Sequence, residues 1–152
     1  MAKIDDLDLT ILSELSEDAA ISVPKLSKKI KVNSSVVYSR IKRLIKHKLI
    51  ERFTIVVNDA ELGFGVKALT GINMDSKKRD NVINELFKID GVREIAEVTG
   101  RFDILVTMYA RSLDDMHKIV SDKIGRIDGV LSSESFIEMK TRNKSMPYMP
   151  PK

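Results

Sequence analysis

The tripeptide Asp-Gly-Val occurs twice in this chain, at residues 90–92 and 128–130. Each copy follows an apolar pattern of helical period and precedes a run rich in β-branched residues. The central glycine suits a tight helix-to-strand turn because it adopts positive φ angles without steric cost. Since the copies are 38 residues apart, the pattern predicts an internal duplication of one β-α-β unit.

The segments around these turns extend the pattern to a complete domain. Strands are predicted at 66–74, 92–98, 102–110 and 130–139. One helix is predicted from a cap at Ser76 to Phe87, and a second from a cap at Ser112. The second helix is predicted to turn five apolar residues inward: Leu113, Met116, Ile119, Val120 and Ile124.

The order β-α-β-β-α-β is that of a ferredoxin-like fold, so the fold class is α+β. Both helices would cover one face of a four-stranded sheet and leave the other face open. That open face would carry Ile72, Val106 and Met108, or the residues that alternate with them. An exposed apolar sheet must be covered, most simply by a second copy of the chain.

Residues 1–52 predict three short helices. Asp5 or Asp6 is expected to cap the first, Ser22 the second with Pro24 in its first turn, and Asn33 or Ser34 the third. Apolar residues recur at helical spacing in each segment, and the third helix is predicted to bury Val37, Ile41, Leu44 and Ile45. The gap at residues 31–33 is the short turn of a helix-turn-helix.

Residues 50–57 are β-branched and partly alternating, which predicts a strand. The bend at residues 62–65 carries two glycines but lacks the third glycine of a nucleotide-binding loop. We therefore predict a helix-turn-helix domain at 1–52, a connecting strand and linker at 53–65, an effector and oligomerisation domain at 66–140, and a tail at 141–152. The proline-rich tail is expected either to be loose or to lie over a neighbour.

The net charge of +4 is concentrated at the front of the chain. Residues 1–52 hold 11 Lys or Arg against 7 Asp or Glu, whereas residues 53–152 hold 15 of each. Residues 19–50 contain nine basic residues and no acidic one. This asymmetry predicts a polyanionic partner, with double-stranded DNA favoured over a solvated helix face or an anionic membrane surface.

The third helix has the composition of a recognition helix. Small or polar residues at its start would let it enter the major groove, and nearby cations would contact phosphates. Arg40 and Arg43 have an alternative role, in which they bind the surface of their own domain, and the lysines could simply be solvated. The predicted DNA-binding residues are Lys25, Lys28, Ser34, Ser35, Tyr38, Ser39, Arg40, Lys42, Arg43 and Lys46.

Other classes of function find little support. The chain has no cysteine, so disulfides, thiolate metal sites and cysteine catalysis are excluded. His47 and His117 are the only histidines, and neither has a carboxylate or metal ligand at a useful spacing. We predict no catalytic residue, no metal and no cofactor. No membrane-spanning run or signal peptide is recognisable, so the expected location is the cytoplasm.

Four stretches, read in order, resemble the Lrp/AsnC, or feast/famine, family of transcription regulators. They are DDLDLTILSELSEDAAISVPKLSKKI, VVYSRIKRLIKHKLIERF, VTGRFDILV and IDGVLSSESF. The resemblance implies a DNA-binding helix-turn-helix domain and a βαββαβ effector domain. It also implies homodimers that assemble further, often to octamers, and amino-acid effectors. The family usually has glycine where this chain has Lys31 and Lys48, glutamate at Ile45, and arginine at Ala20.

Residues 99–103 match the ligand loop of that family. Gly100 would let the backbone approach a ligand, exposed N–H groups could hold a carboxylate, and Asp103 could pair with an ammonium group. The alternative is a simple hairpin that Asp103 braces. The predicted effector-binding residues are Thr99, Gly100, Arg101, Phe102, Asp103, Asp122, Ser133 and Ser135.

Together these patterns predict a sequence-specific transcription regulator controlled by a small molecule, with an amino acid as the expected effector. The main alternative is a non-specific architectural DNA-binding protein. A stand-alone sensor domain is a third class, which the basic N-terminal segment disfavours.

Overall fold

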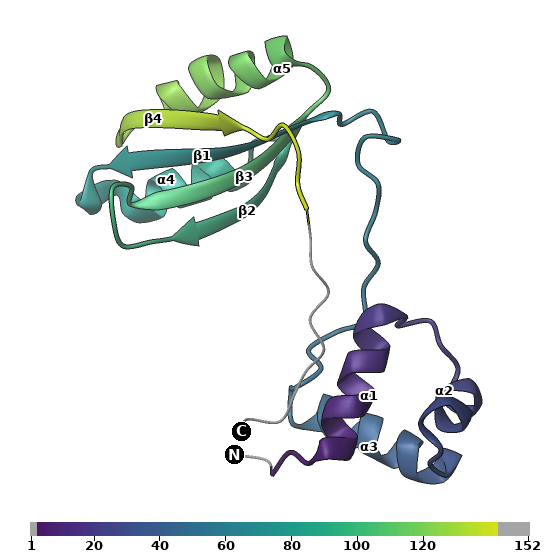
Figure 1. The fold of residues 1–152 in the computed structure, drawn as a ribbon. Helices are drawn as coiled ribbons and strands as arrows, with labels where there is room; N and C mark the ends of the chain where they lie inside the picture. Colours follow the sequence, from purple (N-terminus) through teal and green to yellow (C-terminus); the bar gives the residue numbers. More distant parts are fainter. Residues whose placement is uncertain (1–2, 143–152) are drawn as a thin grey trace. The chain divides into compact units, whose positions relative to one another are not determined.

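The computed structural model describes residues 3–142, so the predicted tail beyond Arg142 lies outside the described residues. The chain forms two compact units, one from its N-terminal part up to Val56 and one from Val57–Thr141. Figure 1 shows the three helices of the first unit and the sheet with its helices in the second.

The first unit contains the three predicted helices, α1 (Asp6–Glu17), α2 (Val23–Ile30) and α3 (Ser34–Lys46). Asp5 caps α1 through a capping box, in which Asp5 and Asp8 each accept a hydrogen bond from the backbone N–H of the other. Asn33 caps α3 by accepting from the N–H of Ser35. Ser22 precedes α2 as predicted, but its side chain makes no capping hydrogen bond.

Ile11, Leu26, Val37 and Leu44 form the fully buried centre of this unit. Ile41 is half-buried against them, but the prediction that Ile45 faces inward is wrong, since 44% of it is exposed. Ile45 follows the buried Leu44 and lies about 100° further round the helix, at the edge of the apolar stripe.

Two turns of this unit, one before α3 and one after it, depend on an unusual backbone conformation. Lys31 has φ +56° and Lys48 has φ +55°, the only positive φ values of non-glycine residues in the described part of the chain. These are the two positions at which the family that this chain resembles usually has glycine. The left-handed conformation places the Cβ atom close to the following carbonyl, so both lysines are strained there.

The predicted strand at 50–57 is wrong for this single chain. Residues 51–58 form neither helix nor strand, and Ile55 and Val56 are 80% and 101% exposed. A strand exists only where its backbone N–H and C=O groups pair with another strand. No strand in residues 3–142 pairs with this segment.

The second unit is the predicted ferredoxin-like fold. Its strands are β1 (Val66–Met74), β2 (Val92–Glu97), β3 (Ile104–Ala110) and β4 (Val130–Ile137). They form one antiparallel sheet in the order β2-β3-β1-β4. Gly91 and Gly129, in the two repeated turns, have φ +98° and +107°, which explains why glycine occurs at both.

The helices lie on one side of this sheet (Figure 1). They are η1 (Ser76–Lys78) with α4 (Arg79–Phe87), and α5 (Leu113–Lys118) followed by η2 (Ile119–Lys123) and η3 (Ile124–Arg126). Ser112 caps α5 as predicted, but the cap before η1 is Asp75, not Ser76, because the Asp75 side chain accepts from Lys77. Leu113 was predicted to face inward and is 61% exposed, since it begins the helix beyond the sheet.

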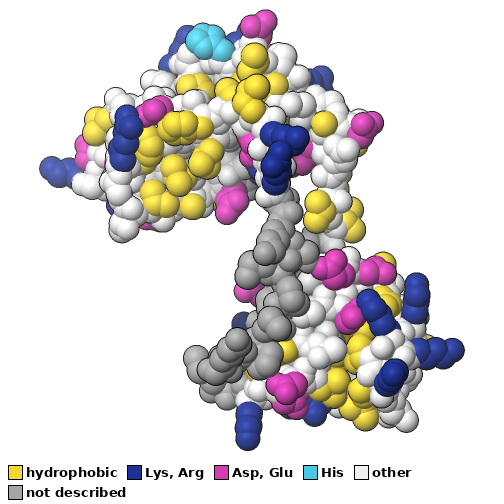
Figure 2. Space-filling view, in the orientation of Figure 1, with side chains coloured by type: hydrophobic (Ala, Val, Ile, Leu, Met, Phe, Trp, Pro, Cys, Tyr) yellow, Lys and Arg dark blue, Asp and Glu magenta, His cyan; other side chains and the backbone are white. Residues whose placement is uncertain are grey.

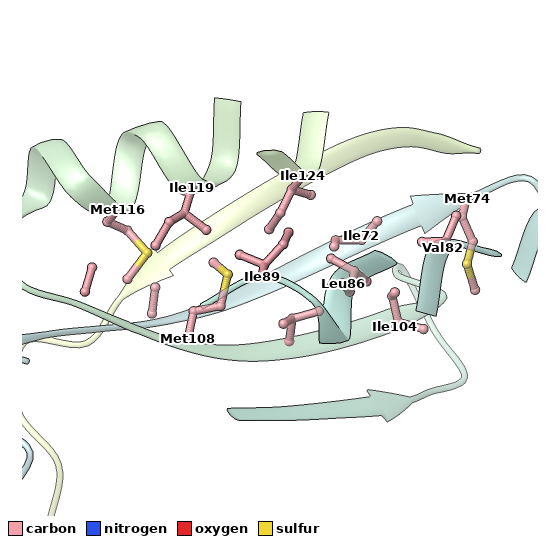
Figure 3. Close-up of a cluster of buried hydrophobic side chains, with 13 residues drawn as sticks. Ile72, Met74, Val82, Leu86, Ile89, Ile104, Met108, Met116, Ile119 and Ile124 are labelled. Carbon is pink, nitrogen blue, oxygen red and sulfur yellow. The ribbon is translucent and has the colours of Figure 1, made fainter. Parts of the chain in front are cut away.

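The core of this unit fills the space between sheet and helices. In Figure 3 the side chains of Met116, Ile119 and Ile124 point from the helical layer toward the strands. Ile72, Val106 and Met108 are fully buried in this core. The open face therefore carries the alternating residues of the same strands, including Leu69 and Leu105.

We expect Lys31→Gly to raise the free energy of unfolding by roughly 0.5–1 kcal/mol, because glycine adopts the left-handed conformation without strain. Urea unfolding followed by circular dichroism measures the change. The control is Lys28→Gly, in the interior of α2, which should lower stability by about 1 kcal/mol. Equal destabilisation by both variants would contradict a strained turn at Lys31.

Candidate functional site

The outward face of α3 is the candidate DNA interface. Tyr38, Ser39, Lys42 and Lys46 are exposed, and Tyr38 leaves 52% of its surface free. The ammonium group of Lys42 lies 4.7 Å from the centre of the Tyr38 ring. This cation–π contact holds a positive charge beside an aromatic ring on the surface of the helix.

The two serines at the start of α3 already have partners within the domain. The Ser34 hydroxyl donates to the Ser27 hydroxyl at 2.9 Å and so joins α3 to α2. The Ser35 hydroxyl donates to the Asn33 side chain at 2.8 Å, beside the cap. A base or phosphate contact by either serine has to share or replace these hydrogen bonds.

Arg40 and Arg43 bind carboxylates of their own domain. Arg40 pairs with Asp5 and, at 3.2 Å, with Asp8, and Arg43 pairs with Asp8 as well. The Asp8 side chain is fully buried, whereas 40% of the Arg43 side chain remains exposed. Both arginines thus bind the surface of their own domain, which the sequence left open as an alternative to phosphate contacts. A carboxylate taken out of water in this way needs such partners.

The outer carboxylate of this cluster is also held ionised. The hydrogen bond from the Arg40 side chain, together with the N–H of Asp8, lowers the pKa of Asp5 to about 2. Asp5 therefore remains negative at neutral pH and keeps Arg40 beside α1. The sequence contained a signal for this cluster, because Asp8 lies between Ile4 and Ile11 on the apolar side of α1.

The lysines of α2 differ in their surroundings. Lys25 and Lys28 are exposed and have no ion pair in the described residues. Lys29 pairs with Glu14 of α1. In Figure 2 lysine and arginine side chains project from the helical unit at several places. Only the unpaired cations are immediately available to a phosphate chain.

The candidate effector loop, residues 99–103, joins β2 to β3. The N–H of Asp103 donates to Ile72, and one Asp103 carboxylate oxygen accepts the N–H of Met74 at 2.8 Å. Asp103 therefore braces the loop against the end of β1, as in the simple-hairpin alternative. Gly100 has φ +148°, and nothing lies within 4 Å of the position where a Cβ would be, so its backbone is open to a ligand.

Arg101 and Phe102 extend from this loop over the open face of the sheet. The Phe102 ring lies so close to Gly71 that a Cβ on Gly71 would be 2.4 Å from it. Arg101 stacks on Phe102 at 5.3 Å and pairs with Glu134 at 2.7 Å. Glu134 was not among the predicted residues. Its position opposite Gly71 in the sheet explains how it reaches Arg101.

The remaining candidate residues lie on the other side. Ser133 and Ser135 share one face of β4, as predicted, because they pair with Ile72 and Thr70 of the buried face. The Ser135 hydroxyl is 2.8 Å from that of Thr70. Asp122 is exposed on η2 and pairs with Arg126 at 3.2 Å. One copy of the chain thus does not bring all the predicted effector residues into a single site.

The open face itself is apolar. Figure 2 shows hydrophobic side chains gathered on the sheet of the second unit. Leu69 and Phe136 are 41% and 49% exposed and are directly opposite each other in the sheet. Leu105 and Tyr109 on β3 are half-buried on the same face. Such a surface is typical of an interface between proteins.

Residues 3–142 contain neither a metal-binding cluster nor a membrane-spanning helix. No group of three or more histidine and acidic side chains there is arranged to hold a metal ion. No helix in this part of the chain has the length and apolar character to cross a membrane.

Comparison with known families gives two matches. Residues 4–45 match the model of the AsnC-type helix-turn-helix domain. Residues 67–148 match the model of the Lrp/AsnC ligand-binding domain. The two matches follow the division of the chain into a helical unit and a sheet unit.

Individual relatives and solved structures point to the same family as these two family models. The chain is 35% identical to the HTH-type transcriptional regulator LrpA of Pyrococcus horikoshii over 127 residues, 84% of this chain and 90% of that protein. It resembles the solved structure of Escherichia coli AsnC with a TM-score of 0.85 and 27% identity, covering 95% and 97% of the two chains. It shares the fold of a Neisseria meningitidis transcriptional regulator, solved as a complex with L-methionine (TM-score 0.89, 19% identity, 97% of each chain).

We expect Arg43→Ala to lower the free energy of unfolding by roughly 2–3 kcal/mol. The variant leaves the buried Asp8 with one partner fewer, and the partial exposure of Arg43 reduces the full cost of breaking a buried pair. Chemical denaturation measures the loss. Lys46→Ala, which removes an unpaired cation one turn further along α3, should change stability by less than about 0.5 kcal/mol. If Arg43→Ala also lowers the free energy of unfolding by less than about 0.5 kcal/mol, the ion pair between Arg43 and Asp8 does not stabilise the fold.

Proposed function

Because the chain belongs to the Lrp/AsnC family of transcription regulators, we propose that it reads a specific DNA sequence under the control of an amino acid. It is a regulator with an AsnC-type helix-turn-helix and a ligand-binding domain, and its family is one of regulators and not of enzymes. Three parts of this function are proposed: the chain prefers a specific DNA sequence, its ligand is an amino acid, and its copies assemble. We propose the cytoplasm as the place of action, since DNA is accessible there.

The single observation that carries the DNA-binding proposal is the exposed face of α3. Tyr38, Ser39 and Lys42 lie within two turns and are free to contact base edges or phosphates. Arg40 and Arg43 support that face from behind by fixing α3 to α1. We infer that these arginines position the recognition helix, and that Lys42, Lys46, Lys25 and Lys28 supply the phosphate contacts.

A non-specific architectural DNA-binding protein is the alternative. It would rely on phosphate contacts alone, whereas the cluster of polar side chains on α3 favours base readout. A specific regulator should prefer its selected site over random competitor DNA by roughly 10³-fold or more. A site selected from a random pool provides the duplex for this comparison.

We expect Lys42→Ala to weaken binding to the selected duplex and to lower the slope of log Kd against log salt by roughly 0.9, the value for one phosphate contact. Fluorescence anisotropy at several NaCl concentrations measures the slope. Lys77→Ala, an exposed lysine of the sheet unit, is the matched control and should leave it unchanged. If Lys42→Ala and the control give the same slope, Lys42 does not contact a phosphate.

The amino-acid proposal rests on the loop at residues 99–103. Its open Gly100 backbone suits a carboxylate, and one oxygen of Asp103 remains without a hydrogen bond within the described residues. That oxygen would accept from an ammonium group, a charge-assisted contact. The methionine complex of the Neisseria protein supports an amino acid as the ligand class.

We expect Asp103→Asn to weaken amino-acid binding at least about tenfold, because it removes the charge that pairs with the ammonium group. Its side-chain oxygen can still accept from Met74, so the melting temperature without ligand should change little. Thermal-shift titration with the amino acid identified in a screen measures both. Asp114→Asn, an exposed aspartate on α5, is the control. Unaltered binding by Asp103→Asn would place the effector site elsewhere.

We also propose that the chain forms homodimers that assemble further, with octamers as the expected final state. Two apolar surfaces support association. One is the open sheet face with Leu69 and Phe136, and the other is the exposed segment at residues 51–58, whose backbone has no strand partner. Because Ser133, Ser135 and Asp122 lie apart from the loop in one copy, a site completed between copies is consistent with this proposal.

We expect Phe136→Asp to shift the protein toward monomers by at least about tenfold in dissociation constant, because it places a charge in the proposed interface. Sedimentation equilibrium measures the shift. Phe87→Asp replaces a phenylalanine of similar exposure on α4 and should leave the assembly unchanged. Loss of assembly in both variants, or in neither, would contradict the open sheet face as the interface.

A further inference from the structure

The second unit contains a hollow of 620 Å³ that is separate from the loop at residues 99–103. It lies at the opposite end of the sheet, where β3 ends and β2 begins, and α5 with η2 forms one wall. Its volume is within the range of small-molecule sites. The lining residues are Phe64, Asp90, Gly91, Arg93, Tyr109, Ala110, Arg111, Asp115, Lys118, Ile119 and Lys123.

A hydrogen-bonded bend places Phe64 in this hollow. The N–H groups of Leu62 and Phe64 both donate to the carbonyl of Asp59, and Gly63 takes φ +87° to close the turn. The Phe64 ring then lies 5.7 Å from the Arg93 guanidinium and 6.0 Å from that of Arg111. The bend is therefore more than a connection, because it brings an aromatic ring to two cations.

The backbone at the base of the hollow is equally constrained. The N–H of Tyr109 donates to the carbonyl of Gly91 at 2.8 Å. A Cβ on Gly91 would lie 2.4 Å from the Tyr109 carbonyl oxygen, so only glycine allows this approach. The Tyr109 backbone therefore lies beside Gly91 in the lining of the hollow.

The charges around the hollow are not balanced. Arg93, Arg111, Lys118 and Lys123 line it against two carboxylates, Asp90 and Asp115. None of these six side chains takes part in an ion pair within residues 3–142. Arginines 79, 101 and 126 of the same unit, in contrast, each pair with a carboxylate. Unpaired cations that outnumber the carboxylates around them favour an anionic ligand.

We propose that this hollow binds a small organic dianion that has a flat apolar body, such as a phosphomonoester or dicarboxylate attached to an aromatic ring. Two negative charges match the excess of two cations over carboxylates in the lining. The body of the ligand would lie against Phe64 and Ile119. This site is additional to the proposed amino-acid site and does not depend on it.

The arrangement favours a small ligand over duplex DNA. The cations surround a concave space, and the half-buried Asp115 and the exposed Asp90 stand within the same lining. A phosphate chain crossing this surface would meet both carboxylates. A compact dianion can enter the hollow and contact the cations while its body covers the Phe64 ring.

Isothermal titration of the full chain tests the proposal with four probes. Adenosine 5′-monophosphate and phthalate carry two charges on a flat body and represent the phosphomonoester and the dicarboxylate. Adenosine lacks the charges, and inorganic phosphate lacks the body. We expect at least one of the first two to bind with a Kd below about 1 mM, more tightly than adenosine or phosphate.

Two variants locate the binding. The double variant Lys118→Glu/Lys123→Glu should weaken binding of the probe by about tenfold or more, because two exposed charges that attract the probe become repulsive. Lys77→Glu with Lys140→Glu makes the same change in net charge outside the hollow and should alter Kd by less than about twofold. Phe64→Leu keeps the charges but removes the aromatic ring, and it should also weaken binding of the probe.

The proposal is overturned if neither dianion binds at about 10 mM. It is also overturned if the control pair weakens binding as much as the Lys118 and Lys123 pair, since the effect would then be one of net charge. A third result also overturns it: duplex DNA displaces the probe, and DNA binding falls more than probe binding when the charges are reversed. These cations would then belong to a DNA-binding surface.

Discussion

The orientation of the recognition helix depends on one buried carboxylate. Asp8 lies on the apolar side of α1, is fully buried, and accepts from both Arg40 and Arg43 of α3. A buried charge with a missing partner costs several kcal/mol, so the two helices are held in the arrangement that satisfies it. The outward face of α3, with Tyr38 and Lys42, follows from that arrangement. The arginines thus fix α3 against α1.

The second unit depends on a division of its sheet into two faces. Ile72, Val106 and Met108 are buried against the helices, so the alternating residues are left on the open face. The same alternation separates the residues of the loop from those of β4. Arg101 and Phe102 lie over the open face, whereas Ser133 and Ser135 lie on the helix side. A ligand site that uses both groups therefore calls for more than one copy.

Local sequence rules succeeded where the determining contacts are close in the chain. Ser112 was predicted as a cap, and Asp5 and Asn33 were each one of two predicted candidates, because a cap acts on a backbone N–H only two or three residues away. The glycines at 91 and 129 were predicted as turn residues for the same reason. Lys31 and Lys48 show the limit, because nothing in a lysine side chain indicates a left-handed backbone.

Residue types and short spacings were enough to predict the helices of the first unit, the order of strands and helices in the sheet unit, the concentration of positive charge in the first third of the chain, and the family. The tertiary fold was needed to establish which cations are paired, which face of the sheet is open, and that residues 51–58 have no strand partner within residues 3–142. It also brought Phe64, Arg93 and Arg111 to one hollow from three separate segments. Such outcomes depend on groups far apart in the chain, and their pairing is set when the apolar surfaces pack together.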